Sequence, residues 1–482
     1  MRILLTGATG YIGGRLARRL LRRGHELRCL VRHVGKMSDR PWAADPRVEI
    51  IEADLEDAAA TTEAMRGCGP AYYLVHSMLT AGRGYAERDR RLAVSFAEAA
   101  ARTGIERIIY LGGLGELSKD LSEHLASRRQ VESALASGPV PVTAFRAAAI
   151  IGSGSASFET LRYLVERLPV MPTPACVDTE CQPIAIRNVL GYLTDCLDLP
   201  ETIGRTFDLG GADIVTYREL IRIIAEELGL RRRIIIPVPF ISPNLCSFWI
   251  HLLTPMDRRI TRPLADGLRN RVVARDDAAQ RLMPQPLLTP REAVREALRR
   301  MEPHEVETFQ SVACAMPGDP HWAGGAVYMD ERTTETKASP DDVFRTVRRI
   351  GGRNGWYAVD WIWALRGAID RLWGGPGLRR GRRDPERITR GEALDFWRVV
   401  YVERPRRLTL RAEMKVPGEA HLDFRIDPHG SGARITQTAR FRPRGLVGIL
   451  YWYAVMPFHG IVFRGMLRGI RRRAERADGD FT

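Results

Sequence analysis

Lysine is nearly absent from this chain: it occurs at four positions, so 69 of the 73 basic residues are arginine. The formal net charge is nevertheless +15, which is typical of proteins that bind nucleic acids or anionic surfaces. The sequence has no basic stretch interleaved with aromatic residues, no helix-turn-helix pattern and no zinc-finger spacing. The abundance of arginine and alanine therefore indicates a compositional bias, and we expect no nucleic-acid partner.

Cysteine is scarce and shows no spacing typical of a metal site. The seven cysteines are an odd number scattered along the chain, and the Cys176–Cys181 pair alone is a poor metal motif. We expect reduced thiols and no metal ion. No cleavable signal is visible before the first apolar segment, which begins at Arg2, so the expected location is cytoplasmic.

Charged residues are lacking from residues 445–463. This run approaches the length of a membrane span, but Pro457 and His459 interrupt it. Apolar residues recur at steps of three and four along it and beyond, which predicts a helix packed on a core. A membrane-peripheral placement of this basic, apolar helix is the weaker alternative. The residues predicted to face the core are Met456, Gly460, Phe463, Leu467 and Ile470.

The most informative feature that is present lies at the start of the chain. An apolar run over residues 3–5 predicts a buried strand, and Gly7, Gly10 and Gly13 then lead into a helix that begins near Tyr11. Glycines allow the tight turn, the close approach of a pyrophosphate and the packing of helix on strand, while the helix start offers free N–H groups. This pattern predicts a dinucleotide site. The candidate contacts are Thr6, Gly7, Thr9, Gly10, Tyr11 and Ile12.

Strands and helices alternate through the first half of the chain, which predicts a doubly wound parallel sheet over residues 1–300. We place a linker at residues 301–325, which are rich in proline and glycine, and a second domain at residues 326–482. The predicted strands are 2–6, 26–31, 48–52, 71–76, 107–111, 140–146 and 206–209, and the predicted helices are 11–23, 58–65, 85–103, 121–137 and 217–228.

The amino-acid composition changes in the second half of the chain, where seven of the nine tryptophans lie beyond residue 300. The pattern predicts a strand at 328–336, a helix at 341–349 and a long closing helix. Between them, four segments have the period and spacing of an antiparallel meander, so this domain is expected to be of the α+β class. These segments are 394–403, 406–416, 420–427 and 432–442.

Side chains at the carboxyl ends of the predicted strands are further candidates for cofactor contact. Arg32 ends the second strand, where NAD-binding versions of this fold carry an acid, and a cation there suits the 2′-phosphate of NADP. NADP(H) is therefore favoured over NAD(H). Asp54 and Leu55 suit an adenine, with helix capping by Asp54 as the plainer alternative. His76 and Ser77 close the fourth strand, at the edge where ligands bind.

Taken together, these residues resemble the short-chain dehydrogenase/reductase superfamily in its extended or atypical branch. That superfamily carries a catalytic Ser after the fifth strand and a Tyr-x-x-x-Lys pair on the next helix. Here Gly112 and Gly113 end the fifth strand, while His124 and Arg128 stand at the Tyr and Lys positions. The resemblance implies His124 as a proton carrier and Arg128 as a ribose or phosphate contact, or else helical positions without a catalytic role.

Within the superfamily, the pattern is most similar to the group of the 39-kDa-type NAD(P)-binding subunit of respiratory complex I. The matching segments are 74–78, 182–186 and 207–211, and the group often holds its nucleotide without demonstrated turnover. Residues 182–186 would lie near a substrate cleft formed by residues 147–186 and 230–290.

The second half resembles an uncharacterised domain often fused to such proteins and similar to START-type helix-grip folds. The matching segments are 374–382, 394–399 and 451–453. An aromatic-lined apolar cavity and an ordinary aromatic core are both compatible with its Trp and Tyr residues.

Two functions follow as hypotheses. The chain is either an NADP-dependent oxidoreductase or epimerase-like enzyme acting on a small apolar or carbonyl-bearing molecule, or a catalytically silent NADP(H)-binding scaffold or sensor. In the second case, the C-terminal domain would bind a lipid or a protein partner.

Overall fold

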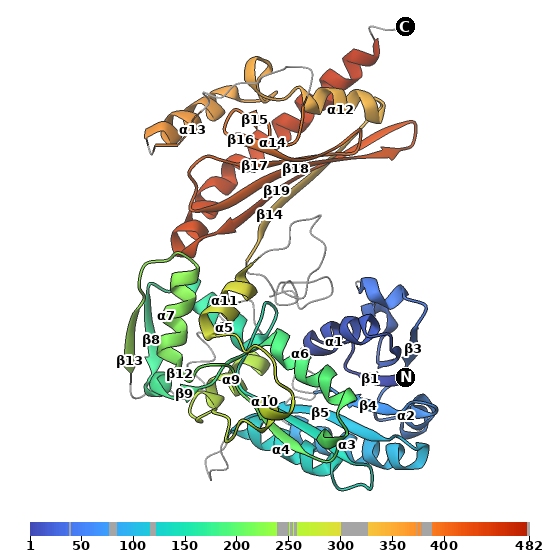
Figure 1. The fold of residues 1–482 in the computed structure, drawn as a ribbon. Helices are drawn as coiled ribbons and strands as arrows, with labels where there is room; N and C mark the ends of the chain where they lie inside the picture. Colours follow the sequence, from blue (N-terminus) through green and yellow to red (C-terminus); the bar gives the residue numbers. More distant parts are fainter. Residues whose placement is uncertain are drawn as a thin grey trace. The chain divides into compact units, whose positions relative to one another are not determined.

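The computed structural model divides the chain into two compact units, Met1–Gly325 and Ala326–Thr482 (Figure 1). It describes all residues except 38–39, 77–83, 116–121, 239–249, 251–253, 255–257, 300–325, 373, 376, 378–387 and 480–482. The predicted linker and Ser77 therefore lie outside the described residues.

The N-terminal unit is built on a seven-stranded sheet in the order β11-β6-β5-β4-β1-β2-β3, with every neighbouring pair parallel. The strand order reverses between β1 and β4, and ligands bind at such a switch point in open α/β sheets. The prediction of a doubly wound Rossmann sheet is confirmed. The strands are β1 (Arg2–Thr6), β2 (Glu26–Val31), β3 (Val48–Glu52), β4 (Pro70–Tyr73), β5 (Arg107–Gly113), β6 (Val142–Ala147) and β11 (Thr206–Leu209).

Helices cover both faces of this sheet because successive side chains of each buried strand point to opposite sides. On β1, Ile3 and Leu5 pack under α1 (Tyr11–Arg22) and α6 (Ile186–Asp195). Leu4 packs on the other side with α2 (Ala58–Met65), α3 (Tyr85–Thr103) and α4 (Glu123–Leu135). The side chains on the two faces of these continuously apolar strands thus belong to two separate cores, one on each side of the sheet.

Element boundaries differ from the predicted ones at the carboxyl edge of the sheet. The fourth strand ends at Tyr73, so His76 lies in the segment after it. The fifth strand continues to Gly113, two residues beyond its expected end, and α4 begins at Glu123 instead of residue 121. The glycines that end the fifth strand belong to its hydrogen-bonded ladder with β6.

A smaller lobe within the same unit packs around a third core. It contains paired short strands, including β8 (Val170–Pro174) with β13 (Ile234–Val238) and β7 (Ile150–Ile151) with β10 (Ile184–Ala185). Helices α5 (Ala156–Arg167), α7 (Tyr217–Glu227), α9 (Arg258–Gly267), α10 (Ala278–Leu282) and α11 (Pro290–Leu298) complete this part of the chain, together with β9 (Glu180–Cys181) and β12 (Val215–Thr216).

The C-terminal unit is a six-stranded sheet in the order β14-β19-β18-β17-β16-β15, antiparallel throughout. The predicted meander is confirmed, except that Asp395, with φ of +54°, separates β15 from β16. The strands are β14 (Tyr328–Thr336), β15 (Ala393–Leu394), β16 (Trp397–Glu403), β17 (Arg407–Ala412), β18 (Gly418–His429) and β19 (Gly432–Pro443); the helices are α12 (Pro340–Arg348), α13 (Asp360–Leu372) and α14 (Gly445–Gly479).

The tryptophan-rich segment forms part of the core of this unit. Trp356 and Trp363 lie with ring centroids 4.9 Å apart, and both pack against Phe396. The Trp356 indole donates a hydrogen bond of 2.9 Å to Asp395, so its buried N–H is satisfied. Of the two interpretations of these rings, the aromatic core is the one that the packing supports.

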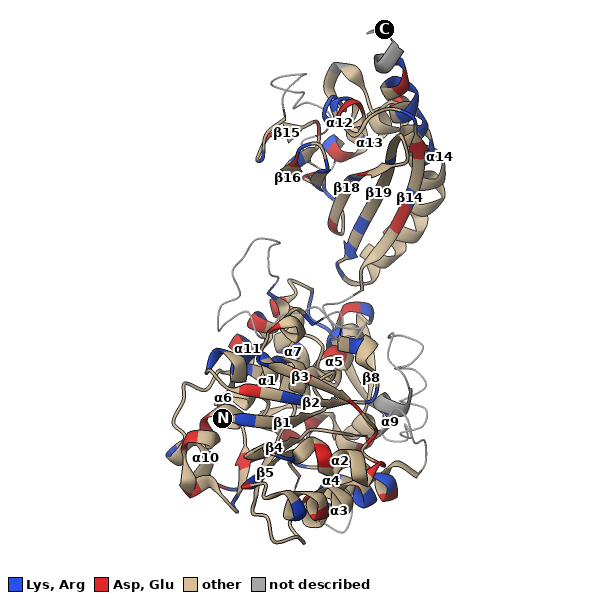
Figure 2. Cartoon of the chain, turned by 90° about the vertical axis from the view of Figure 1, so that its right-hand side faces the viewer, with Lys and Arg blue, Asp and Glu red and all other residues tan. Residues whose placement is uncertain are grey.

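Helix α14 departs from its predicted orientation over its first half. Phe463, Leu467 and Ile470 face the core as expected, but Met456 is 47% exposed. Within the described residues, α14 is long and apolar enough to cross a membrane, by length and composition alone, and 22% of its most apolar window is buried. Figure 2 shows no charged residue along this first half and arginines along the second.

Candidate nucleotide and substrate site

The glycine loop between β1 and α1 has the geometry that a diphosphate requires. Gly7 adopts a φ of +77°, and a side chain at Gly13 would collide with the Gly7 carbonyl oxygen. Helix α1 begins after Gly10 with no side-chain cap and no acidic residue in its first turn. Its N–H groups and positive dipole end therefore suit an anion. These residues fit the diphosphate of a dinucleotide.

The other residues predicted around the loop divide into structural and open positions. Thr6 is fully buried, and its hydroxyl donates to the Tyr72 carbonyl oxygen at 2.9 Å, so it ties β4 to β1. Thr9 is half-buried, and its carbonyl oxygen accepts a hydrogen bond of 3.0 Å from Arg40. No local pattern predicts this buried arginine next to the loop. Tyr11 and Ile12 line a cavity described below.

The adenine-side candidates occupy the ends of β2 and β3. Arg32 and Lys36 are exposed just beyond β2, where a ribose phosphate would lie. Asp54 is half-buried, and its carboxylate accepts the Glu56 N–H at 3.0 Å. It is not the cap of α2, as the plainer interpretation proposed, because the N-cap is Asp57, whose carboxylate accepts from the N–H groups of Ala59 and Ala60. Leu55 is buried in the core beneath α2 and α3.

His76 forms an acid–imidazole pair that the sequence did not predict. Its Nδ1 lies 2.8 Å from Oδ2 of Asp89, a residue of α3 whose side chain is only 4% exposed. Its Nε2 is buried and has no hydrogen-bond partner among the described residues. Burial and the Arg128 guanidinium lower the pKa of His76 to about 4, against the opposing effect of Asp89. His76 is therefore neutral at pH 7.

A signal for Asp89 does exist in the sequence. On a helix, residue 89 lies on the same face as Leu92, Ala93 and Phe96, which are all buried. An acid in such an apolar stripe needs a partner, because burying an unpaired carboxylate is costly. That partner, His76, could not be identified without the fold.

The structure places His124 beside His76. The two ring centroids are 5.5 Å apart, although His76 follows β4 and His124 lies in the first turn of α4. Burial, Arg128 and His76, in that order, lower the pKa of His124 well below its usual range. The Nδ1 atom of His124 is buried without a partner among the described residues. Two neutral imidazoles with unpartnered nitrogens thus face each other across the edge of the sheet.

Packing explains why no serine stands at the end of β5. A side chain on Gly113 would begin 2.9 Å from Cδ2 of Leu125 on α4, and one on Gly112 would begin 2.9 Å from the Tyr110 ring. Both distances are shorter than van der Waals contact. The Tyr110 hydroxyl donates to the Arg128 carbonyl oxygen at 3.1 Å, which holds α4 close to the strand.

An apolar cavity of about 880 Å³ joins the glycine loop to the lobe. On the sheet side, its wall includes Tyr11, His76 and His124, together with Arg128. On the lobe side, the wall is mostly apolar, with contributions from α5, α7 and α9 and the hydroxyl groups of Ser157, Thr160 and Thr173. Part of the predicted cleft is therefore correct, since residues 147–177 contribute, but Gln182 and Pro183 do not line it. Gln182 instead binds backbone, donating to the Gly211 carbonyl oxygen at 2.8 Å.

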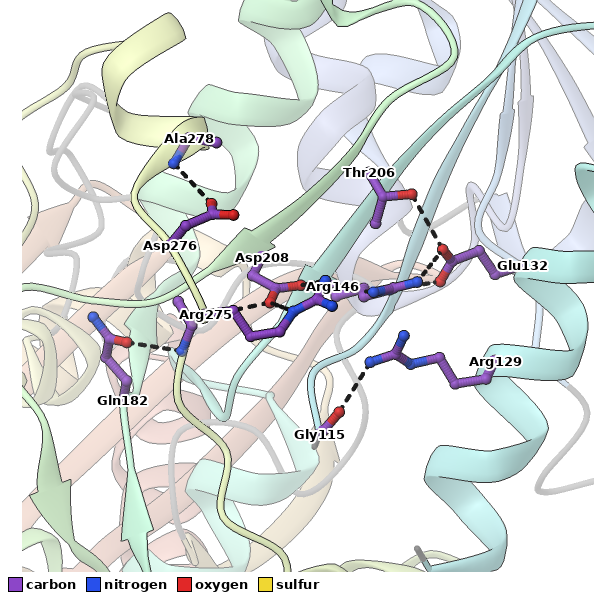
Figure 3. A network of polar contacts seen from close by, with 11 residues as sticks. Gly115, Arg129, Glu132, Arg146, Gln182, Thr206, Asp208, Arg275, Asp276 and Ala278 are labelled. Carbon is purple, nitrogen blue, oxygen red and sulfur yellow. Dashed lines mark hydrogen bonds and ion pairs between the residues drawn. The ribbon is translucent and has the colours of Figure 1, made fainter. Parts of the chain in front are cut away.

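A buried ionic network fixes the helix that carries His124 and Arg128 (Figure 3). Arg146 on β6 donates two hydrogen bonds, of 2.9 and 2.6 Å, to the carboxylate of Glu132 on α4. Arg275 donates to Asp208 on β11 at 2.7 Å, and Arg146 lies 3.9 Å from the same carboxylate. Because the paired charges are held on three separate elements, the network sets the position of α4 on the sheet edge.

Comparisons with known proteins agree with this geometry. Residues 7–150 match a family described as NAD(P)H-binding, and residues 322–466 match a protein family of unknown function, DUF2867. No cluster of metal-binding side chains occurs among the described residues.

Characterised relatives align with the N-terminal unit. A ceramide reductase of Caulobacter vibrioides is 28% identical over 239 residues, 48% of this chain and 72% of the relative. Subunit 9 of the NADH dehydrogenase alpha subcomplex of Arabidopsis thaliana is 26% identical over 236 residues, 46% of this chain and 56% of the relative. The alignment thus spans little more than half the length of the plant subunit.

Among solved structures, a triphenylmethane reductase of a Citrobacter species superposes with a TM-score of 0.51 at 20% identity, covering 62% of this chain and 99% of that one. The N-terminal unit is accordingly an NAD(P)-binding Rossmann-type domain related to the atypical short-chain dehydrogenase/reductases. The match to the plant NADH dehydrogenase subunit agrees with the predicted group. The family matched by residues 322–466 is of unknown function, so the START-like assignment of the C-terminal unit stays a prediction.

Proposed function

We propose that the N-terminal unit is an NADPH-dependent reductase of an apolar, carbonyl-bearing molecule. The observation that carries this proposal is the cavity of about 880 Å³, because its imidazoles and its guanidinium group lie on the sheet side, beside the glycine loop, and most of the remaining wall is apolar. Reductase activity in a relative of this unit, the ceramide reductase, supports the same reaction class. The exposed Arg32 and Lys36 at the end of β2 favour NADPH over NADH.

Bound NADPH would supply a hydride to the carbonyl carbon. The chain's own residues would then supply one proton to the carbonyl oxygen. His124 would take up a proton from solvent and pass it to the carbonyl oxygen from its cavity side, which returns the ring to its neutral form, and the His76–Asp89 pair would position that ring. Asp89 is a positioning residue in this arrangement, because it touches His76 and not the substrate. Arg128 opposes protonation of both rings and contacts the ribose or a phosphate.

Turnover of NADPH with a panel of long-chain ketones and aldehydes tests the proposal. We expect NADPH oxidation to depend on the carbonyl compound, and His124→Ala to lower kcat/KM by about 10²–10⁴. Gln130→Ala, at an exposed position of the same helix outside the cavity wall, serves as the matched control and should leave the rate within about twofold. Turnover that is indifferent to His124→Ala would contradict the assigned role.

A second candidate is a silent NADP(H)-binding sensor, favoured by the absence of the Ser, Tyr and Lys of the superfamily and by the packing that excludes a side chain at Gly113. Tight NADPH binding without turnover over the whole panel would support it. Mass spectrometry of small molecules released from freshly purified protein would identify the nucleotide and any apolar ligand together.

For the C-terminal unit we propose a helix-grip fold of the START-like type. The support is an antiparallel six-stranded sheet against which a C-terminal helix packs, with buried contacts from Phe463, Met466 and Ile470. An experimental structure of the full chain in which α14 does not lie against β14 and β19 would contradict this assignment.

A further inference from the structure

The C-terminal unit exposes two apolar helix faces. On α14, the exposed side chains up to residue 461 carry no charge, and they include Val447, Leu450, Tyr453, Met456, Phe458 and Ile461. On α13, Trp361, Leu365, Ile369 and Leu372 are exposed at helical spacing, with Trp361 66% exposed. We call these residues the α13–α14 apolar face. Contiguous exposed apolar surface of this kind marks a binding site.

One loop connects the two helices of this face. The carbonyl oxygen of Lys415 accepts a hydrogen bond of 3.0 Å from Arg366 on α13, and its N–H donates to Asp370 at 2.7 Å. Residues 415–417 also form a shallow depression with Val447, Leu450 and Tyr451 of α14. This loop contacts α13 on the side of the buried Asp370, away from the exposed stripe. Tyr357 and Ala358, just before α13, lie against Gly469 and Gly465 of α14, so the start of α13 is next to the helix that carries the other stripe.

The distribution of charge between the two units indicates that the partner of this face is anionic. Residues 326–482 hold 31 basic and 19 acidic residues, a net charge of +12, whereas residues 1–325 hold 42 and 39, a net charge of +3. Almost all of the excess positive charge thus lies in the smaller unit. Arg464, Arg468 and Arg472 continue the exposed stripe of Ile461 at steps of three and four residues, and none forms an ion pair with a described residue.

Helix α14 cannot cross a bilayer in this fold, because its opposite side is packed. Trp452, Phe463 and Met466 are buried against the sheet, and the exposed apolar part from 446 to 461 is only about 24 Å long. A hydrocarbon core is about 30 Å thick. An apolar stripe followed by arginines instead matches a helix that lies in the membrane interface, with side chains in the acyl region and guanidinium groups on phosphates.

We propose that the α13–α14 apolar face docks the protein onto an anionic lipid bilayer, with Trp361 and Ile461 inserted and Arg464, Arg468 and Arg472 on the headgroup phosphates. This inference does not depend on the reductase proposal. It assigns the excess arginine of the C-terminal unit a binding role beside the compositional bias.

Sedimentation of the full-length protein with vesicles tests the docking. We expect binding to phosphatidylcholine vesicles containing one-third phosphatidylglycerol, and about tenfold or more weaker binding to phosphatidylcholine alone or at high salt. Ile461→Glu and Arg468→Glu should each reduce binding by at least about fivefold. Ile234→Glu is the matched control, because Ile234 and Ile461 are both 60% exposed but lie in different units; it should bind like the unmodified chain.

Trp361 provides a second readout that does not rely on sedimentation. Brominated acyl chains should quench part of the fluorescence of vesicle-bound protein, and Trp361→Phe should abolish most of that quenching. Equal binding by the Ile461→Glu and Ile234→Glu variants would overturn the proposal. The proposal would also be overturned if the unmodified chain did not bind vesicles and instead formed a dimer, in analytical ultracentrifugation without lipid, that Ile461→Glu dissociates. This face would then be a subunit interface.

Discussion

The two units place their apolar surface and their charge in opposite ways. The N-terminal unit is nearly neutral, at +3, and encloses its functional apolar surface in a cavity of about 880 Å³ beside a glycine loop. The C-terminal unit carries +12 and turns its unpaired apolar side chains outward on α13 and α14. A concave apolar site selects small molecules, whereas a convex one requires a partner of its own size. Under the two proposals, the N-terminal unit carries the chemistry and the C-terminal unit the attachment to a membrane.

The largest expected effect concerns the ionic network of the N-terminal unit. Arg146→Met removes both guanidinium hydrogen bonds of the buried Glu132 carboxylate, which keeps the Thr206 hydroxyl and the nearby charge of Arg129. We expect the free energy of unfolding to fall by about 3–5 kcal/mol. Hydrogen exchange should show the loss of protection in peptides of residues 1–325 and none in residues 326–482.

The matched control for this change is an exposed pair in the same unit. Arg291→Met removes contacts with Glu226 and Glu227 at the surface, and we expect a loss below about 1 kcal/mol. Equal losses for both variants would mean that the network does not hold α4 in place.

Nucleotide affinity should respond only to the glycine loop. Gly13→Ala places a methyl group against the Gly7 carbonyl oxygen, so the loop must shift. We expect the Kd for NADPH, measured by fluorescence titration, to rise by about 100-fold, equivalent to about 3 kcal/mol. Gly460→Ala in α14 is the control, because nothing lies within 4 Å of its added Cβ, and NADPH affinity should not change.

Acid should destabilise the C-terminal unit through one histidine. Burial lowers the pKa of His459 to about 4; Asp330 raises it and Arg332 lowers it. The unfolded chain binds the proton first, so stability is full above pH 6.5 and falls as the pH decreases towards 4, by up to about 3 kcal/mol. Denaturant unfolding across this range measures the loss. His459→Gln should flatten it, and an unchanged pH profile would contradict the assignment.

The smallest effect should come from the apolar face itself. Ile461→Ser exposes no core and breaks no hydrogen bond, so the free energy of unfolding in the absence of lipid should change by less than about 0.5 kcal/mol. Phe463→Ser, two residues along the same helix but buried, should cost several times more. Chemical denaturation of both variants distinguishes a face kept for binding from a misassigned part of the core.

The sequence predicted the fold better than the site, for physical reasons. Apolar runs such as residues 3–5 are unambiguous in a parallel sheet, and the glycine spacing has few other uses. The His76–Asp89 contact joins residues from different elements, so no local pattern could pair them. The cavity wall on α5 has the same periodicity as a packed core. Met456 was assigned inward because residues 445–463 have no charged side to orient them.

The absence of a side chain at the end of β5 has a consequence under the reductase proposal. A side chain at Gly113 would meet Cδ2 of Leu125, and the helix that holds Leu125 also carries His124 and Arg128. A serine at this position would therefore require Leu125 to move, and with it the packing beside the two imidazoles. Substitutions that reshape the apolar wall of the cavity require no such movement, so variants of this unit should differ in the molecules they accept before they differ in the groups that handle the proton.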